Sequence, residues 1–217
     1  MTYKIKAPSH IDTTINLPAS KSISNRALIL HALSGGKELP QNLSDCDDTE
    51  VIINALRDMP PTIDIKAAGT AMRFMTAYLS VTPGEHTITG TERMRHRPIR
   101  VLVDALRTLG ADIQYTDEEG YPPLHINGHS LEGGILTIPG DVSSQYISAL
   151  LMVGPTMKKG LTLRLSGDIV SRPYIDLTLH VMHEFGISVD WTNVDTISVE
   201  HQGIHEQPYT IENDWSA

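Results

Sequence analysis

Two basic side chains stand at the start of a predicted helix in the stretch LPASKSISNRALIL, residues 17–30. Lys21 and Arg26 bracket a cluster of serines where an apolar helical run begins. The first turn of a helix exposes unpaired N–H groups, and the helix dipole already favours negative charge there. Two cations at this position are therefore unfavourable unless an anion lies between them. That anion is either a ligand or a carboxylate of the protein itself.

Two further predicted helices begin with the same kinds of residue. Gly69 and Thr70 open the run AGTAMRFMTAYLS, and Ser143 and Ser144 open SSQYISALLMVGP. Hydroxyl residues cap helices by accepting hydrogen bonds from free N–H groups, and capping alone explains any one of these starts. If all three starts meet at one end of the domain, their dipoles and hydroxyl groups together form an anion-binding site.

Arginines gather at these and related positions. Arg73 lies one turn into the second helix, Arg172 opens a later helix, and the stretch TERMRHRPIR carries Arg93, Arg95, Arg97 and Arg100. A guanidinium binds carboxylate or phosphate through two parallel hydrogen bonds, whereas a lysine ammonium acts as a compact charge. Surface pairing with the protein's own carboxylates explains any single arginine. The whole set favours a small ligand with several negative charges.

The elements that position these residues recur three times along the chain. The helices opening near Ser20, Gly69 and Ser143 are separated by 49 and 74 residues. A second series of helices, starting at 47, 97 and 172, is separated by 50 and 75 residues. Alternating apolar and β-branched residues predict short strands at 86–90, 111–115, 123–127, 134–140, 161–167, 186–191 and 196–201. The pattern predicts an α/β fold of three similar units packed as one domain.

The composition excludes several classes of protein. The net charge of −9 argues against a general nucleic-acid binder or a membrane-surface binder, since both need a basic face. A single cysteine, Cys46, excludes a disulfide framework and fits a reducing compartment. No apolar run reaches transmembrane length, and the first residues lack the apolar core of a signal peptide. A soluble cytoplasmic protein is therefore expected.

Motifs for cofactors and metals are missing from the sequence. It contains no glycine-rich loop of the dinucleotide or Walker type. The ten histidines, including His180 and His183, do not form a zinc-protease motif. We therefore expect no cofactor and no metal. Asp45, Asp47 and Asp48 surround Cys46, and their charges are expected to raise its pKa.

Five motifs in this order resemble one enzyme family. LPASKSISNRALIL, AGTAMRF, RHRPI, VSSQY and GDIVSRPYID are similar to the signature stretches of the 3-phosphoshikimate 1-carboxyvinyltransferase (5-enolpyruvylshikimate-3-phosphate synthase) family. The resemblance implies one lobe of the enolpyruvyl transferase inside-out α/β barrel, with three βαβαββ repeats around parallel helices. Family members are about twice this length, so the chain resembles an isolated first lobe that ends at the strand crossing into the second.

The resemblance also implies an organisation and a set of site residues. Residues 1–12 would pack with the second lobe, which is absent here, and residues 13–217 would bind shikimate 3-phosphate. Lys21 would be a catalytic residue that reaches both substrates. The implied shikimate 3-phosphate contacts are Lys21, Ser22, Arg26, Ser143, Ser144, Gln145, Ser171 and Tyr174. The implied phosphoenolpyruvate contacts are Lys21, Gly69, Arg97 and Gln145.

The chemistry implied is an addition followed by an elimination. The 5-hydroxyl of shikimate 3-phosphate attacks C2 of phosphoenolpyruvate while C3 is protonated, and the tetrahedral intermediate then loses phosphate. In the family, the catalytic carboxylate and several lysines and arginines belong to the second lobe. The resemblance therefore predicts partners of two kinds, the two small substrates and that second lobe, and no turnover by this chain alone. It implies a monomer for the full-length enzyme.

The sequence departs from the family pattern in one motif, AGTAMRF with the residue before it. Three rival interpretations of the function also remain. Ala67 replaces a usual asparagine, and Phe74 replaces a usual proline, which leaves phosphoenolpyruvate affinity and glyphosate sensitivity open. The UDP-N-acetylglucosamine enolpyruvyl transferases usually carry a cysteine where this chain has Glu92. RNA 3′-phosphate cyclases share similar repeats, but the acidic balance disfavours RNA. A non-catalytic anion-binding module is the third interpretation.

Overall fold

The computed structural model describes residues 3–4 and 6–215. The helices are α1 (Lys21–Leu33), α2 (Asp47–Asp58), α3 (Gly69–Val81), α4 (Glu92–Arg95), α5 (Arg100–Thr108), α6 (Ser144–Val153), the short 3₁₀ helix η1 (Gly154–Thr156) and α7 (Arg172–Glu184). The strands are β1 (Thr62–Asp64), β2 (Gly84–Thr89), β3 (Asp112–Tyr115), β4 (Leu124–Gly128), β5 (Gly134–Pro139), β6 (Leu161–Ser166), β7 (Val189–Asn193) and β8 (Thr196–Val199).

Two four-stranded sheets share one topology. Their strand orders are β1-β2-β4-β3 and β5-β6-β8-β7, so the second repeats the first strand for strand. In each sheet the first two strands are parallel and the other neighbours antiparallel. A helix must connect the parallel pair, and α3 and α6 do so. The predicted α/β class and two βαβαββ units are confirmed, although the short strand β1 was not predicted.

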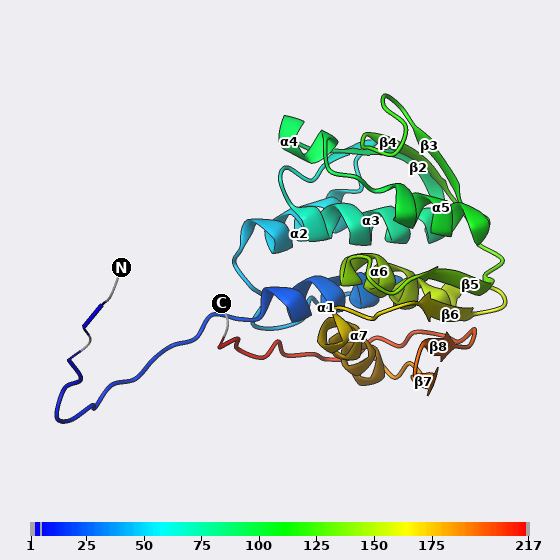
Figure 1. The fold of residues 1–217 in the computed structure, drawn as a ribbon. Helices are drawn as coiled ribbons and strands as arrows, with labels where there is room; N and C mark the ends of the chain where they lie inside the picture. Colours follow the sequence, from blue (N-terminus) through cyan, green and yellow to red (C-terminus); the bar gives the residue numbers. More distant parts are fainter. Residues whose placement is uncertain (1–2, 5, 216–217) are drawn as a thin grey trace.

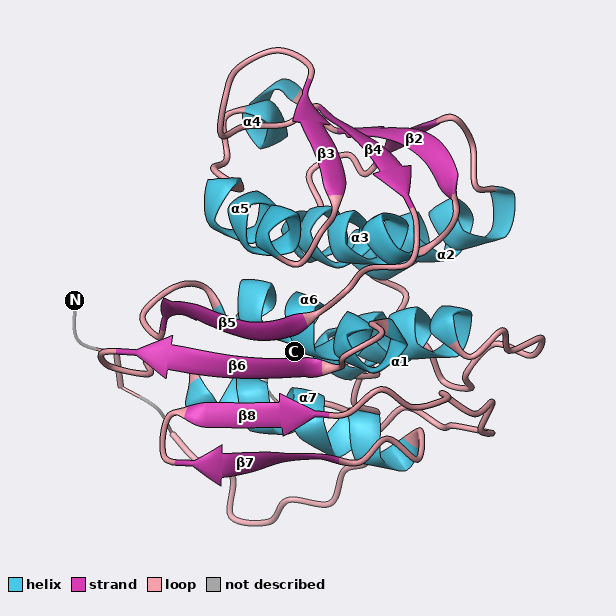
Figure 2. Cartoon of the chain, turned by 90° about the vertical axis from the view of Figure 1, so that its right-hand side faces the viewer, coloured by secondary structure: helices cyan, strands magenta, loops and turns pink. Residues whose placement is uncertain are grey.

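The helices form two sets that differ in burial. Along α1, α3 and α6 nearly every residue beyond the first turn is buried, so these helices are covered on all sides. The outer helices α2, α5 and α7 bury one face only. Figure 2 shows the sheet containing β2, β3 and β4 lying over α3 and α5, with the other sheet beside α6 and α7. The core therefore lies around three helices that begin at the predicted repeat positions.

The first repeat differs from the prediction because it has no sheet of its own among the described residues. Ala19 pairs with Asn213, and Gln41 pairs with Thr210, as isolated bridges. The partners lie far apart in sequence, and prolines 18, 40 and 208 flank them. Proline cannot donate to a strand ladder, so the pairing stays short. The backbone N–H of Ser20 nevertheless donates to the carbonyl of Glu212 at 2.9 Å.

The segment before α1 has no regular secondary structure. Residues 6–17 form no helix or strand and run away from the body of the molecule (Figure 1). The predicted N-terminal segment 1–12 lies partly outside the described residues.

A helix was expected to begin at Arg97, but α5 begins at Arg100. Ile99, with a φ of −135°, is the N-cap residue of α5, which leaves Arg97 and Pro98 in the connection from α4, whereas the equivalent Arg172 begins α7.

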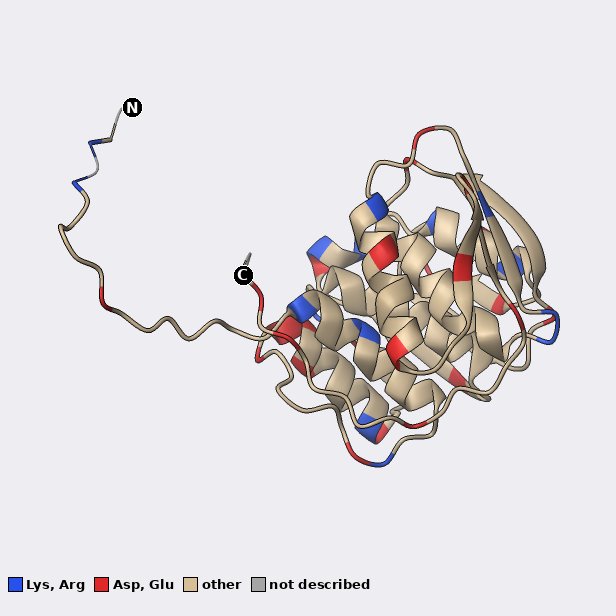
Figure 3. Ribbon diagram, turned by 90° about the horizontal axis from the view of Figure 1, so that it is seen from below, with Lys and Arg blue, Asp and Glu red and all other residues tan. Residues whose placement is uncertain are grey.

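Charged residues are intermingled on the surface. Figure 3 shows Lys and Arg segments interspersed with Asp and Glu segments over the helices, without one broad basic face in this view from below. Of the helices that the structure describes, none is long and apolar enough to cross a membrane.

Candidate functional site

The starts of the inner helices meet at one cavity of about 280 Å³. It receives residues from the first turns of α1, α3, α6 and α7. Positive helix-dipole ends and hydroxyl groups therefore converge at one place, which favours an anion. The lining residues are Lys21, Ser22, Asn25, Arg26, Thr70, Ser143, Ser144, Gln145 and Tyr174. Asn25 and Thr70 were not among the predicted site residues.

Capping accounts for only part of this arrangement. Ser20 caps α1 by accepting a hydrogen bond from the N–H of Ile23 at 3.4 Å. Ser143 caps α6 by accepting from the N–H of Gln145 at 3.3 Å. The residue before α3 is Ala68, whose side chain cannot cap, so the positive end of α3 has no side-chain acceptor. The helix starts thus retain capacity to bind an anion.

Arg26 is held by the protein on almost every side. Its side chain is buried, and four hydrogen bonds occupy its guanidinium. The acceptors are the hydroxyl groups of Thr178 (2.7 Å) and Ser148 (3.0 Å) and the carbonyls of Ser22 (2.8 Å) and Tyr174 (3.4 Å). Since a guanidinium has five N–H donors, one remains. The residue joins α1 to α6 and α7 and leaves one donor free.

The charge of Arg26 has no carboxylate partner among the described residues. Burial lowers its pKa to about 10, which still keeps it protonated at neutral pH. Its guanidinium lies 5.4 Å from the ring centre of Phe74, which is fully buried. The residue that departs from the family pattern at 74 thus supports this arginine through a cation–π contact. A buried, uncompensated positive charge beside the cavity strengthens its preference for an anion.

Arg73 has a similar position on α3. It is buried, and burial lowers its pKa. Its guanidinium donates to the carbonyls of Gly69 (3.1 Å) and Pro98 (3.2 Å) and lies 5.8 Å from the ring of Tyr146. The hydroxyl of Tyr146 also donates to the Pro98 carbonyl, at 2.8 Å. Arg73 therefore positions the Arg97–Pro98 connection and leaves ligand binding to other residues.

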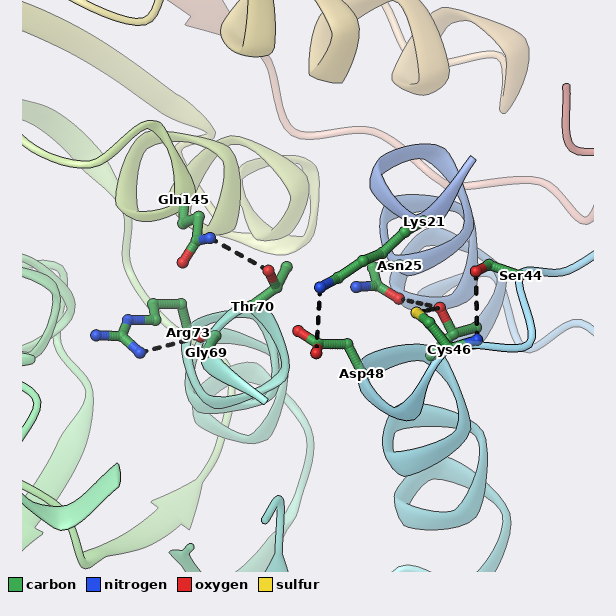
Figure 4. Close-up of polar contacts among 10 residues, drawn as sticks. Lys21, Asn25, Ser44, Cys46, Asp48, Gly69, Thr70, Arg73 and Gln145 are labelled. Atoms are coloured by element: carbon green, nitrogen blue, oxygen red, sulfur yellow. Dashed lines mark hydrogen bonds and ion pairs between the residues drawn. The ribbon is translucent and has the colours of Figure 1, made fainter. Parts of the chain in front are cut away.

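Two polar contacts link the helix starts to one another (Figure 4). The Gln145 side-chain amide on α6 donates to the Thr70 hydroxyl on α3 at 3.2 Å. The Lys21 ammonium on α1 lies 3.2 Å from an Asp48 carboxylate oxygen on α2. The Lys21 side chain is about half exposed, so its ammonium can reach a ligand while Asp48 orients it. Thus the cavity has a pre-arranged polar rim.

Cys46 lies close to this rim, and the expectation for its pKa was wrong. Burial raises the pKa of the thiol, but hydrogen bonds with Ser44 and Thr49 and the charge of Lys21 outweigh burial, and the net shift is downward. Its sulfur lies 3.3 Å from the Thr49 hydroxyl. The neighbouring aspartates do not dominate, because the Asp48 carboxylate faces Lys21 instead.

Arg97 occupies a second, adjacent cavity of about 420 Å³, lined by Ala67, Arg93, Met94 and Arg97. Arg97 is exposed. Its guanidinium lies so close to the Cα of Gly69 that a β-carbon at residue 69 would collide with it. Glycine at residue 69 therefore lets the arginine cross closely over the start of α3. The two predicted phosphoenolpyruvate residues Gly69 and Arg97 are in direct contact, next to the first cavity.

Some of the predicted residues are elsewhere. Ser171 precedes α7 without a side-chain cap bond and does not line the first cavity. Arg100 pairs with Glu119 at 3.3 Å. Arg172 stacks on the ring of Trp191, 3.9 Å from its centre. The interpretation that all the arginines serve one ligand is therefore wrong for Arg100 and Arg172. No group of three or more His, Cys, Asp or Glu side chains among the described residues could hold a metal ion.

The repeated units and the cavity at their helix starts define one lobe of an enolpyruvyl-transferase-type α/β fold. Two solved structures titled EPSP synthase from Acinetobacter baumannii have this fold. They match with a TM-score of 0.81 at 24% identity, over 93% of this chain and 50% of theirs.

Sequence comparison identifies the family. The model of the EPSP synthase (3-phosphoshikimate 1-carboxyvinyltransferase) family matches residues 5–63 and 60–217. A relative from Bacteroides fragilis, named 3-phosphoshikimate 1-carboxyvinyltransferase, is 64% identical over 217 residues, 100% of this chain and 53% of its own length. One of the same name from Tolumonas auensis is 38% identical over 100% of this chain and 57% of its own length. The chain belongs to the EPSP synthase family and spans about half the length of these relatives.

Proposed function

We propose that this chain is the shikimate-3-phosphate-binding lobe of an enzyme that transfers the enolpyruvyl group of phosphoenolpyruvate. The acceptor is the 5-hydroxyl of shikimate 3-phosphate, and phosphate is released. The observation that carries the proposal is the cavity at the starts of α1, α3 and α6, where positive dipole ends meet the Lys21 ammonium and the buried Arg26 guanidinium. Family membership and the names of the relatives support it. A cytoplasmic location in the shikimate pathway belongs to the same proposal.

Shikimate 3-phosphate would occupy the first cavity. Its phosphate would accept hydrogen bonds from serine hydroxyls at the start of α6 and from the helix N–H groups there. Arg26 would act mainly through its charge, because four of its hydrogen bonds go to the protein. The residues proposed to contact this substrate are Lys21, Ser22, Arg26, Ser143, Ser144, Gln145, Ser171 and Tyr174. Of these, Ser171 has the weakest structural support, since it does not line the cavity.

Phosphoenolpyruvate would lie between the two cavities. Arg97 is exposed beside Gly69, and Gln145 reaches the start of the same helix, so their donors can converge on one anion. The Lys21 ammonium would weaken its ion pair with Asp48 and turn to the substrate. There it would stabilise the charge that develops as the hydroxyl adds to C2. The hydroxyl loses its proton as C3 gains one, and loss of phosphate from C2 together with a proton from C3 then forms the enol ether. These donors would stabilise both the intermediate and the leaving phosphate.

A second lobe would supply the remaining groups. Both cavities are partly open to solvent, and a reaction of this kind is favoured by exclusion of water. The chain alone is therefore proposed to bind shikimate 3-phosphate and to lack turnover. Product formed by the isolated chain from the two substrates would contradict this part of the proposal.

The test is a thermal-shift titration of this chain with shikimate 3-phosphate, with shikimate and inorganic phosphate as controls. Ligand at about a hundred times its Kd stabilises a fold by about 2.7 kcal/mol, which gives a clear rise in Tm. Lys21→Ala and Ser144→Ala are each expected to weaken binding about tenfold or more, because each removes a donor to an anion. An equal shift with shikimate 3-phosphate in wild type and both variants would contradict the proposed site.

A further inference from the structure

Asn25 is a buried polar residue on α1 whose hydrogen bonding is incomplete. Its side chain is 1% exposed. The carboxamide oxygen accepts a hydrogen bond from the Thr49 hydroxyl on α2 at 2.8 Å. The carboxamide nitrogen, by contrast, has no partner among the described residues. One half of the side chain is thus anchored in the protein, and the other half is a free donor.

A free buried donor is unfavourable in a folded protein. Leaving it unpaired costs the desolvation free energy of the group, whereas an apolar side chain of the same shape avoids that cost. The packing between α1 and α2 does not itself require an amide nitrogen, because the contact with Thr49 uses only the oxygen. The nitrogen is therefore available to a group outside the described chain.

The surroundings indicate what that group is. Asn25 lines the first cavity, one helical turn beyond Lys21 and next to Arg26. Figure 4 shows its nitrogen turned toward Lys21 and Asp48 and away from Cys46. Asp48 already faces the Lys21 ammonium. With two cations beside it, an amide donor is suited to an oxygen of an anionic ligand and unsuited to a cation.

The direction of the amide is fixed by its neighbours. Thr49 is completely buried, and its hydroxyl lies between the Asn25 oxygen and the Cys46 sulfur, 3.3 Å from the latter. The hydroxyl donates to the amide oxygen and so holds the nitrogen toward the cavity. Pre-orientation of this kind lowers the entropic cost of binding.

We infer that Asn25 is a substrate-binding residue that donates a hydrogen bond from its carboxamide nitrogen to a phosphate, carboxylate or hydroxyl oxygen of the ligand. The inference rests on the proposed function, since it takes the ligand of this cavity to be shikimate 3-phosphate. It adds a donor that the sequence motifs did not indicate. It also gives Thr49 a role as a positioning residue that acts through Asn25.

Calorimetric titration of this chain tests the inference with two substitutions. Asn25→Leu keeps the shape and removes the donor, and its Kd for shikimate 3-phosphate is expected to rise about ten- to a hundredfold. Asn25→Asp keeps the acceptor for Thr49 but places an anion at the ligand, so a larger rise is expected. Asn193→Asp, an exposed change of equal charge on β7, should leave the Kd within about twofold.

Two smaller probes locate the contact. If the Kd for inorganic phosphate rises in Asn25→Leu, the amide contacts the phosphate group. If only the Kd for shikimate rises, it contacts the ring carboxylate or a hydroxyl. Either result supports the inference, and a Kd unchanged for all three ligands in both Asn25 variants overturns it while leaving the proposed function intact.

Two further measurements keep the inference falsifiable if shikimate 3-phosphate fails to bind. The ligand-free Asn25→Leu chain is expected to unfold at the wild-type temperature or above, because Thr49 can donate to Cys46 instead. The side-chain ¹⁵N–¹H₂ resonances of Asn25 should move when inorganic phosphate or shikimate is added. A destabilised Asn25→Leu chain with unmoved resonances would show that the carboxamide serves only the fold.

Discussion

The two arginine-containing regions of the site use the same side chain in opposite ways. Arg26 and Arg73 are buried, donate to hydroxyl groups and carbonyls of the protein, and each lies over an aromatic ring. Arg93 and Arg97 are exposed and line an open cavity. The buried pair orients the helices, and the exposed pair remains free for a ligand. Burial therefore separates the pair that holds the helices together from the pair that is accessible to a ligand.

The buried pair has no carboxylate partner among the residues that the structure describes, and its surroundings explain why that is tolerated. Burying a charge without a partner costs desolvation free energy. Hydrogen bonds donated by the N–H groups of the arginine offset that cost, and so does a nearby anion. Within the described part of the chain, Arg26 has the hydrogen bonds but no carboxylate beside it. Ligand binding at the first cavity would supply the missing charge close to it. We expect the scaffold to become more stable when the site is filled.

The largest expected effect separates the two kinds of arginine by stability. Arg26→Met leaves the hydroxyls of Thr178 and Ser148 without their donor, and we expect the free energy of unfolding to fall by about 3 kcal/mol. Arg97→Met, an exposed change, should alter it by less than about 0.5 kcal/mol. Urea denaturation of both variants measures the difference. Equal losses would show that the burial of Arg26 does not set its role.

A smaller effect is expected where glycine and the exposed arginine meet. In Gly69→Ala the new methyl group collides with the Arg97 guanidinium, which can swing away because it is the end of a flexible side chain. We expect phosphoenolpyruvate affinity, measured by calorimetry with shikimate 3-phosphate present, to fall about tenfold. Stability should be unchanged or raised by up to about 1 kcal/mol, since alanine favours helices.

Gly203→Ala is the matched control for that substitution. A β-carbon at residue 203 would meet no atom closer than 3.9 Å, so the added methyl group fits and affinity should be unaffected. If Gly69→Ala lowers stability and leaves affinity unchanged, the close contact with Arg97 serves packing and not the ligand.

The repeat spacing made the convergence of helix starts predictable. Offsets of 49 and 74 residues imply equivalent helices, and equivalent helices in a packed domain begin at the same end. The types of residue at those starts then predicted an anion site with Lys21, Arg26 and Ser144 in it, and the family resemblance added Gln145. Hydroxyl residues and cations at three equivalent helix starts were enough to predict the anion site, without any knowledge of side-chain contacts.

Long-range pairing could not be predicted in the same way. Arg26 finds its acceptors 122 and 152 positions away, and no local pattern reports such a contact. The orphaned amide of Asn25 depends on which face of α1 meets α2. Cys46 was misjudged because neighbours in sequence were counted as neighbours in space. Strand β1, only Thr62–Asp64, is too short for an alternating pattern to be recognised.

The smallest expected effect extends the comparison to a buried base that can lose its charge. His31 lies near the other end of α1, is buried, and has a ring nitrogen without a partner among the described residues. Burial lowers its pKa below the usual 6.5, although Glu206 opposes this, and Lys37 and Arg57 line the same cavity. Unlike Arg26, it is therefore expected to be neutral in the fold.

The sign of the pH dependence follows from that lowered pKa. Between the folded-state pKa and 6.5 the unfolded chain binds more protons, so the free energy of unfolding rises with pH and is fully present above 6.5. His31→Gln should flatten this rise in urea denaturation series from pH 5 to pH 7.5, whereas His180→Gln, an exposed change on α7, should keep it. If the free energy of unfolding of His31→Gln rises with pH as steeply as that of the wild type, His31 gains a proton in the fold as readily as in the unfolded chain. Burial would then not determine which basic side chains of this lobe lose their charge.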